Sequence, residues 1–417
     1  MCNFVKLDLA KMKIEELCDV LNPQARVQAI TKLLKGKGRG KRVLDGLAGS
    51  SSAVLFSRLP QRKNPYLIVC NDLDEAGYMY HDLCQINGEG KVLIFPSGYK
   101  RDIKYGQVDA PSEILRTEVL NKWYNDKNVG WVVTYPEALA EQVSSKEDID
   151  DTTITLNKGT EVDMTELAKQ LRSYGFQDVD YVYEPGQFAL RGSILDVYSF
   201  SNELPYRLDF FGDEIESIRT FNVETQLSEQ NLDSIFILGG SCSESGNGVS
   251  LLHYIDDDTV LLCSDAEWLR SRIKAIGEEK LSDSTIIANE GDKNAMDKIV
   301  DADEFIRRFN EFVRIDFNTA ETAEVVGEKL SFHCSPQGIY HKNFDIISKS
   351  FHDFMEKGYQ IYILSDSEKQ IERLRLIFED RNDQINFTPV TRTLHSGFVD
   401  NDLKVCVFTD HQIFDRF

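Results

Sequence analysis

The sequence contains no apolar run of the length that crosses a lipid bilayer. A membrane-spanning helix needs about 20 consecutive apolar residues, and no segment of the 417-residue chain approaches that length. The first residues, MCNFVKLDLAKMKIEEL, also lack the apolar core of a signal peptide. These absences disfavour a membrane protein, and we expect a cytoplasmic one.

The spacing that marks disulfide pairs or zinc ligands is absent as well. The eight cysteines are far apart and never form C-x-x-C, and the seven histidines are equally dispersed. His333, Cys334 and His341 come closest to a cluster, but they contain no pair at zinc-ligand spacing. Several cysteines lie in apolar runs such as YLIVC and KVCVF, which is typical of buried, reduced thiols. We therefore expect no metal site.

Basic residues are scarce relative to acidic ones. The chain has 47 Lys and Arg against 69 Asp and Glu, a net charge of −22. Binding to a phosphate backbone normally needs a basic surface, so the composition disfavours autonomous binding to nucleic acid, although a local basic patch can coexist with an acidic total. A protein partner is the better expectation.

Short apolar runs alternate with amphipathic segments in the first third of the chain. Three mainly apolar runs are typical of buried parallel strands, residues 66–70, 91–96 and 130–136, and residues 41–46 form a further strand that leads into a loop. Amphipathic stretches at residues 74–85 and 112–124 fit the helices between them. We predict an α/β fold whose main domain is a RecA/helicase-like doubly wound parallel sheet.

An acidic break at residues 144–151 ends this pattern. Beyond it, Asp163 and Glu166 form a capping box for a helix over residues 164–175, and closely spaced strand signals follow with Gly and Pro between them. This predicts an inserted α+β module with an antiparallel sheet. From residue 343 the chain returns to alternating helices and strands, which predicts a further small α/β domain. The sequence stops directly after a strand, and we expect a fragment of a longer protein.

The segment LDGLAGSSSAV (residues 44–54) has the position of a phosphate-binding loop, between a strand and a helix. A P-loop reads G-x-x-x-x-G-K-[ST]. Here Gly46 opens the loop and Gly49 lies within it, but three positions depart from the pattern: Ser51 replaces the second glycine, Ser52 the lysine and Ala53 the hydroxyl residue. Without the lysine and the magnesium ligand, only amide dipoles face the phosphates. We interpret the loop as degenerate, and a nucleotide site built on the serines is the alternative.

The acidic motif that forms the second element of an NTPase site is incomplete too. Hydrolysis needs an acidic residue after a buried strand to hold the metal. Asp265 follows the apolar run TVLLC, but Ala266 stands in the place of the usual catalytic glutamate. We therefore predict no ATPase activity for this fragment.

Residues 184–228 combine arginine, carboxylate and aromatic groups on strands. Alternation along an antiparallel strand places one set inward, Tyr206, Leu208 and Phe210, and another outward, Arg207, Asp209 and Phe211. Arg191 adds a second guanidinium beside a turn, and Phe188 lies three residues before it. This composition is typical of interface hot spots. The alternative is a solvated face with ordinary salt bridges.

The same segment resembles the domain 2 signature shared by the excision repair protein UvrB and the transcription-repair coupling factors. The first half of that signature, G-[EQ]-[FY]-x-x-R-G-x-[IL]-[IL]-D, is filled by Gly186, Gln187, Phe188, Arg191, Gly192, Ile194, Leu195 and Asp196. The second half is filled by Pro205, Arg207, Asp209, Phe211, Asp213, Glu214, Ile215, Glu216, Ile218 and Arg219. A match this long and ordered is more specific than any lone glycine motif.

The loop at residues 44–54 favours the coupling factors, because UvrB keeps the lysine while their UvrB-like N-terminal module has a degenerate nucleotide site. The resemblance implies four domains in family order: 1–140 (domain 1a, α/β with the degenerate loop), 141–222 (domain 2, the α+β module), 223–333 (domain 1b, which completes the α/β domain) and 334–417 (domain 3, small α/β).

The resemblance implies a non-catalytic function for this fragment. Domain 2 would recruit UvrA to lesions at stalled RNA polymerase, and a C-terminal domain of the full-length factor would mask that surface. ATP and Mg²⁺ are expected only at the motor domains of the full-length protein, an ATP-dependent DNA translocase that contacts RNA polymerase and DNA through its C-terminal part. The alternative is a UvrB-like enzyme that binds ATP and damaged DNA.

The residues expected at the UvrA contact follow from the same match. Arg191 matches an arginine of the UvrB pattern at that contact, and Phe188 matches the aromatic ahead of it. Arg207 and Asp209 lie on the same strand face. UvrB has a further arginine where this chain has Ala189, a departure that bears on the strength of the contact.

Overall fold

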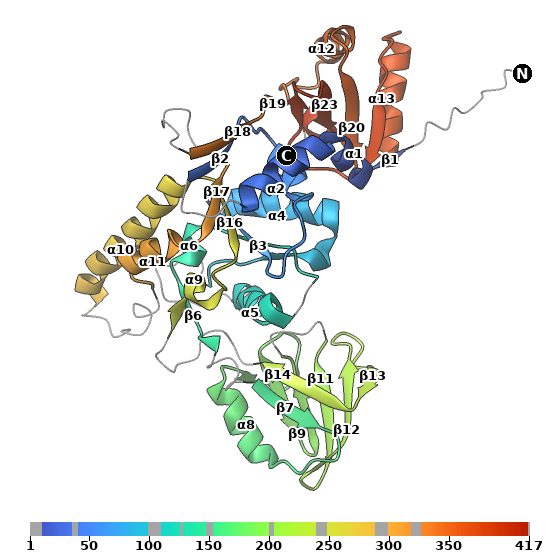
Figure 1. Ribbon diagram of the computed structural model, residues 1–417. Coiled ribbons are helices and arrows are strands. Elements are labelled where there is room, and N and C mark those ends of the chain that lie inside the picture. Colours follow the sequence, from blue (N-terminus) through green and yellow to red (C-terminus); the bar gives the residue numbers. More distant parts are fainter. Residues whose placement is uncertain are drawn as a thin grey trace, which may run out of the picture.

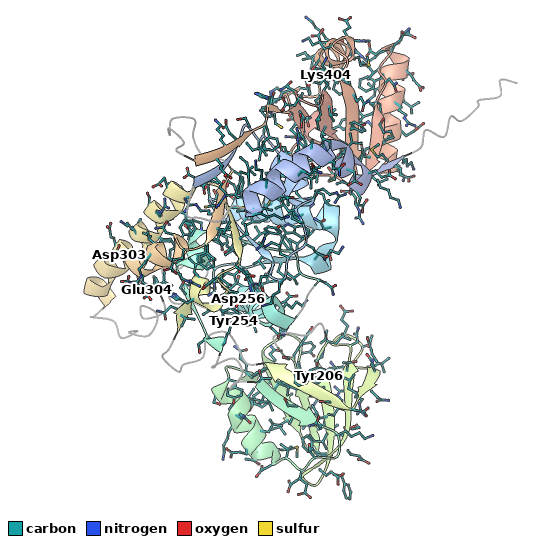
Figure 2. All side chains as sticks on the ribbon, in the orientation of Figure 1. Tyr206, Tyr254, Asp256, Asp303, Glu304 and Lys404 are labelled. Atoms are coloured by element: carbon teal, nitrogen blue, oxygen red, sulfur yellow. The ribbon has the colours of Figure 1, made fainter. Side chains whose placement is uncertain are left out.

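The computed structural model describes residues 11–35, 41–98, 110–125, 128–146, 153–199, 204–238, 248–287, 299–317 and 327–415. Figure 1 shows an elongated molecule in which a central α/β body lies between the inserted module at one end and the C-terminal domain at the other. Figure 2 places Tyr206 in the module and Lys404 in the C-terminal domain, far apart in this view.

The central body is built on a seven-stranded sheet in the order β18-β2-β17-β16-β3-β5-β4, with every neighbouring pair parallel. Its strands are β2 (Lys41–Asp45), β3 (Tyr66–Val69), β4 (Val92–Ile94), β5 (Trp131–Thr134), β16 (Val260–Cys263), β17 (Val313–Asp316) and β18 (Gly327–Ser331). Strands from before and after the module therefore belong to one sheet. The prediction of an α/β fold with a parallel sheet is confirmed.

Helices cover this sheet: α2 (Gln24–Lys35), α3 (Ser51–Phe56), α4 (Leu73–Asn87), α5 (Ala110–Asn125), α6 (Pro136–Leu139), α9 (Leu251–Tyr254), α10 (Ala266–Ile287) and α11 (Ala302–Phe309), with a single 3-10 turn, η1 (Glu89–Lys91). Side chains start several of them. Asp72 accepts the N–H of Glu75 to cap α4, and Asp301 accepts the N–H of Glu304 to cap α11. The predicted helices at 74–85 and 112–124 correspond to α4 and α5.

The inserted module packs helix α8 (Met164–Ser173) against a six-stranded sheet in the order β13-β12-β11-β10-β9-β8. These strands are β8 (Gln177–Asp178), β9 (Gln187–Arg191), β10 (Ile194–Val197), β11 (Tyr206–Phe211), β12 (Glu214–Phe221) and β13 (Ser228–Leu232). All neighbours are antiparallel except the short β8–β9 pair. Asp163 caps α8 as predicted, accepting the N–H groups of Thr165 and Glu166.

The module extends further than the sequence predicts. β14 (Ser234–Leu238) pairs with β7 (Thr153–Asn157), and Ile235 and Ile237 complete the core under α8. The boundary predicted at residue 222 is therefore too early, because Leu232 of β13 and Ile235 and Ile237 of β14 pack in the core of the module and not in the central body. The sequence of a five-residue strand such as β14 does not indicate whether the strand packs in the core of the module or in that of the central body.

A short ribbon connects the module to the body. β6 (Gln142–Val143) pairs antiparallel with β15 (Val249–Ser250), so the chain leaves and returns side by side. The fully buried Arg116 fixes this point, because its guanidinium pairs with Glu141 at 3.0 Å and donates to the carbonyl oxygens of Pro96 and Gln142. A buried arginine that is paired with a carboxylate and bonded to two carbonyl oxygens anchors the ribbon.

The C-terminal domain has a mixed six-stranded sheet in the order β1-β21-β20-β23-β22-β19. Its elements are β1 (Met12–Lys13), α1 (Ile14–Leu21), β19 (Cys334–Pro336), α12 (Phe344–Glu356), β20 (Gln360–Ser365), α13 (Glu368–Asp380), β21 (Thr388–Thr391), β22 (Phe398–Asp400), β23 (Val405–Thr409) and α14 (Asp410–Ile413). The predicted helices and strands after residue 343 are confirmed.

The start of the chain belongs partly to this last domain, which corrects the assignment of residues 1–140 to a single α/β domain. β1 pairs with β21, and α1 buries Leu17 and Leu21 among residues of β20 and β23. Val54 and Ile86 of the central body join the same cluster. The amphipathic helix α1 therefore fills the interface, or seam, between the two domains. The sequence does not indicate this position, because the residues that α1 contacts come from distant segments.

No helix in the described ranges is long and apolar enough to span a membrane. Within the same ranges, no group of three or more His, Cys, Asp or Glu side chains could hold a metal ion. The six described cysteines are free thiols, and four of them are buried; Cys2 and Cys242 lie outside the described residues. Burial raises the pKa of Cys18 to about 11, which keeps this thiol protonated at neutral pH.

The position of α1 predicts that two substitutions by alanine on this helix differ sharply in their effect on stability. Leu17→Ala removes a fully buried side chain from the seam and should cost about 2–5 kcal/mol of local stability, whereas Val20→Ala on the exposed side of α1 should change it by less than about 0.5 kcal/mol. Hydrogen exchange of β20 and β23 measures both. Equal protection in the two variants would show that α1 does not support the C-terminal domain.

Candidate partner-binding site

The strands of the module present two chemically different faces. Tyr206, Leu208 and Phe210 of β11 are buried against α8, while Arg207 and Asp209 are partly exposed and Phe211 is 79% exposed. The predicted alternation is confirmed, even though a bulge follows Asp209. We call the side away from α8 the outer face; it carries Arg191, Asp196, Arg207, Asp209 and Arg219.

The buried carboxylate of Asp196 organises the outer face. Asp196 lies on β10 directly opposite Arg207 on β11, and it accepts two hydrogen bonds from that guanidinium, Nε to Oδ1 at 2.7 Å and Nη2 to Oδ2 at 2.8 Å. Arg191 donates to the same Oδ2 atom. One carboxylate that is 1% exposed therefore holds two arginines in fixed positions.

The guanidinium of Arg207 is occupied by contacts within the module. Besides Asp196, it donates to the backbone and side-chain oxygens of Gln226, and its guanidinium lies 4.1 Å from the ring centroid of Phe221. The hydrogen bond to Asp196 raises the pKa of Arg207. Its side chain is only 13% exposed. It offers a partner little surface and acts mainly by positioning Asp196.

Arg191 is the guanidinium that a partner can reach. Its side chain is 32% exposed, and its Cζ atom lies 4.6 Å from the ring centroid of Tyr181. Tyr181 and Tyr183 are both exposed, while Val182 between them is buried with Ala189 and Phe221 on the outer face. The strap from Tyr181 to Tyr183 thus crosses this face, puts the Tyr181 ring beside Arg191 and leaves the Tyr183 ring exposed.

The structure corrects the predicted role of Phe188 and locates Asp209. Phe188 is 0% exposed and lies in the core under α8, so its ring cannot touch a partner; alternation on β9 sends it inward when Ala189 faces outward. Asp209 is partly exposed; it accepts a hydrogen bond from the hydroxyl of Ser217 and forms an ion pair with Arg219 at 2.7 Å. Tyr181 was missed by the sequence analysis, although its tyrosine-valine-tyrosine alternation indicates two rings on one side of an extended segment.

The loop between β2 and α3 (residues 46–50, the β2–α3 loop) joins a strand of the parallel sheet to a short helix. Gly46 and Gly49 both have positive φ, +74° and +53°. The amide of Ala48 donates to the hydroxyl of Ser51 at 2.9 Å. The three residues that depart from the P-loop pattern, Ser51, Ser52 and Ala53, are buried in the first turn of α3. Asp265, the predicted acidic element, caps α10 by accepting the N–H groups of Glu267 and Trp268.

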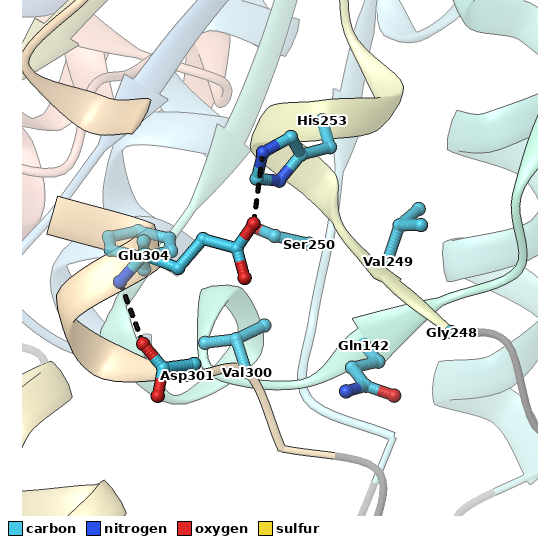
Figure 3. Close-up of a pocket in the computed structure, with 9 residues that line it drawn as sticks. Gln142, Gly248, Val249, Ser250, His253, Val300, Asp301 and Glu304 are labelled. Atoms are coloured by element: carbon cyan, nitrogen blue, oxygen red, sulfur yellow. Dashed lines mark hydrogen bonds and ion pairs between the residues drawn. The ribbon is translucent and has the colours of Figure 1, made fainter. Parts of the chain in front are cut away.

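A separate cavity of about 220 Å³ opens beside the connecting ribbon. Figure 3 shows its lining from β6, β15, α9 and α11. Its charged groups are engaged with one another: His253 Nε2 lies 3.6 Å from Glu304 Oε1, and Asp301 caps the helix that carries Glu304. These contacts are structural, and the cavity has no converging set of groups for catalysis.

The burial of Phe188 yields a prediction about stability. Phe188→Ala should destabilise the module by about 3–5 kcal/mol through loss of packing, while Phe236→Ala, at a 60% exposed position of β14, should change little. Denaturant unfolding followed by circular dichroism compares them. A stable Phe188→Ala variant would contradict the buried placement of this ring.

Comparison with known proteins supports the resemblance. The family model described as the UvrB interaction domain matches residues 154–241, the span of the module from β7 to just beyond β14. Transcription-repair-coupling factors are similar over longer stretches. The Escherichia coli protein is 26% identical over 204 residues, covering 48% of this chain and 18% of that relative. The Bacillus subtilis protein is 28% identical over 202 residues, covering 48% and 17%.

A relative from Staphylococcus aureus extends the match to most of the chain. It is 21% identical over 456 aligned residues, which cover 90% of this chain and 38% of that transcription-repair-coupling factor. The matched region is therefore less than half of each of these relatives. With a match to the UvrB interaction domain at residues 154–241 and similarity over 90% of its length, the chain is similar to part of the transcription-repair-coupling factors of bacteria.

Proposed function

We propose that this chain is a non-catalytic docking module that binds UvrA through the outer face of its inserted domain. In that function it recruits UvrA to lesions at which RNA polymerase has stalled. The observation that carries the proposal is Arg191, which Asp196 fixes in place beside the exposed Tyr181, inside a segment that matches the UvrB interaction domain.

The chemistry of this face suits a protein partner. An arginine held by a buried carboxylate loses little rotamer freedom on binding, so more of its interaction energy appears as affinity. Its exposed part can donate to a carboxylate or a backbone carbonyl of the partner. Tyr181 supplies an exposed ring beside it, and Tyr183 and Phe211 are further exposed rings of the module. Arginine and tyrosine are enriched among residues that dominate interface energetics.

The central body fits the role of a scaffold. We propose that its parallel sheet is RecA-like and that its nucleotide site is inactive. Ser52 stands where a lysine would contact the terminal phosphates, and Asp265 is engaged as a helix cap. Binding of RNA polymerase and DNA, and ATP-dependent translocation with Mg²⁺, would belong to regions of the full-length protein beyond the matched part.

The competing proposal is a UvrB-like enzyme that binds ATP and damaged DNA. It draws on the preserved strand-loop-helix arrangement and on the two glycines with positive φ. It requires nucleotide binding without the lysine.

Arginine substitutions on opposite sides of the module test the docking proposal. Arg191→Ala should weaken UvrA binding at least tenfold, because it removes the positioned guanidinium, with no loss of folding. Arg172→Ala, on α8 with its own ion pair to Asp178, is the matched control and should bind as the wild type does. Calorimetric titration with purified UvrA measures both. Equal affinities for the two variants would remove Arg191 from the contact.

Equilibrium binding with labelled ATP separates the docking module from the enzyme. We expect no saturable, Mg²⁺-dependent binding to the 417-residue chain, because Ser52 replaces the lysine and Ala53 replaces the hydroxyl residue that would bind the metal. Saturable binding that disappears on chelation of Mg²⁺ would instead support the UvrB-like enzyme.

A further inference from the structure

The β2–α3 loop contacts the C-terminal domain through a reciprocal pair of hydrogen bonds. The amide of Ser50 donates to the carbonyl oxygen of Ser396 at 3.1 Å. The amide of Ser396 donates back to the hydroxyl of Ser50 at 2.9 Å. Residues 395–397, which we call the docking segment, thus lie against the loop at the start of α3.

The two glycines of the loop approach protein backbone closely. A Cβ atom on Gly49 would lie 2.6 Å from the carbonyl oxygen of Gly397 and 3.2 Å from that of Ser396. A Cβ atom on Gly46 would lie 1.9 Å from the carbonyl oxygen of Phe332. Glycine at both positions permits positive φ and a close approach. In this chain the group approached is a peptide carbonyl.

Helix α4 and helix α14 hold the docking segment from either side. The buried carboxylate of Asp82 on α4 accepts the amide of His395 at 2.6 Å. The imidazole of His395 stacks on the ring of Tyr78, with centroids 3.4 Å apart and planes 9° from parallel. On α14, Gln412 accepts the amide of Gly397 at 2.7 Å. Contacts on several sides of three residues make this a specific interface.

A second contact ties the same two parts of the molecule together nearby. Arg26 on α2 pairs with the buried carboxylate of Asp400 on β22 at 2.7 Å and donates to the carbonyl oxygen of Leu21. Its guanidinium also lies 5.0 Å from the ring centroid of Phe332. A charged contact therefore lies at the far end of β22, the strand that begins directly after the docking segment.

We propose that the β2–α3 loop is a socket for the C-terminal domain, and that the docking segment and the phosphates of a nucleotide exclude each other from it. The carbonyl oxygen of Ser396 takes the loop amide that a phosphate oxygen would otherwise take. A carbonyl dipole carries no net charge, so the docked segment brings no negative charge that a lysine in the loop would neutralise. A buried ammonium at position 52 would be left without a counter-charge, and the buried serine avoids this.

Two glycine-to-alanine variants test the socket under matched backbone strain. Gly49 and Gly212 have similar φ, +53° and +63°, but a Cβ atom on Gly212 meets nothing within 4 Å. In the 417-residue chain, Gly49→Ala should speed hydrogen exchange at least tenfold in peptides covering residues 394–398 and leave β20 protected. Gly212→Ala should leave both unchanged. Wild-type exchange at 394–398 in Gly49→Ala would overturn the proposal.

Surface variants keep the test decisive if Gly49→Ala does not fold. Tyr78→Ala and His395→Ala each remove one ring of the stack, and the proposal requires that each speeds exchange at 394–398 while the double variant adds less than the sum of the two. Fully additive effects would contradict a shared contact. ATP with Mg²⁺ at millimolar concentration should leave this exchange unchanged in the wild type, because the docked segment keeps the nucleotide out. Saturable binding of ATP with no change in exchange at 394–398 would overturn the mutual exclusion, because bound phosphates and a docked segment would then coexist.

Discussion

The pairing of β3 with β16 is the constraint on which the other features depend. Leu261 of β16 lies in register with Leu67 of β3, and both strands are buried along their whole length. These neighbours in the sheet are separated in the sequence by the entire inserted module. Burial of their apolar side chains therefore closes the body around the insertion and fixes where the module leaves and returns. The ribbon of β6 and β15 and the buried Arg116 follow from that closure.

The two ends of the molecule use the body in different ways. The module is joined to it by the short ribbon, so its outer face stands clear of the other domains (Figure 1). The C-terminal domain instead shares a hydrophobic cluster with the body through α1, Val54 and Ile86. A domain that projects is suited to meeting a partner, and a domain that shares a core is held in one orientation.

Continuous apolar runs made most of the fold predictable from the sequence. The short apolar run of β3 is typical of a buried parallel strand, and Asp163 marks the start of its helix locally. The errors have a common cause in long-range contacts. β14 joined the module, and α1 joined the C-terminal domain, because of surfaces assembled from distant segments.

The candidate site was predictable in its location and less so in its residues. The ordered signature identified β9 to β12, and Arg191 is at the surface as expected. The signature does not distinguish a residue that matches because it binds from one that matches because it packs, and Phe188 is of the second kind. Tyr181 lies before the signature and is brought to Arg191 by the strap across the outer face. The contact of the β2–α3 loop with residue 396 had no local signal at all.

Strand β13 has a consequence for how any partner can approach the module. It forms one border of the six-stranded sheet, and Glu229, Gln230 and Asn231 along it are exposed. Polar and charged side chains on a border strand discourage another chain from extending the sheet through main-chain hydrogen bonds. A partner would therefore be recognised through side chains on the face of the sheet and not through main-chain pairing at its edge. Side-chain contacts distinguish one protein from another, whereas main-chain hydrogen bonds are available to any extended chain.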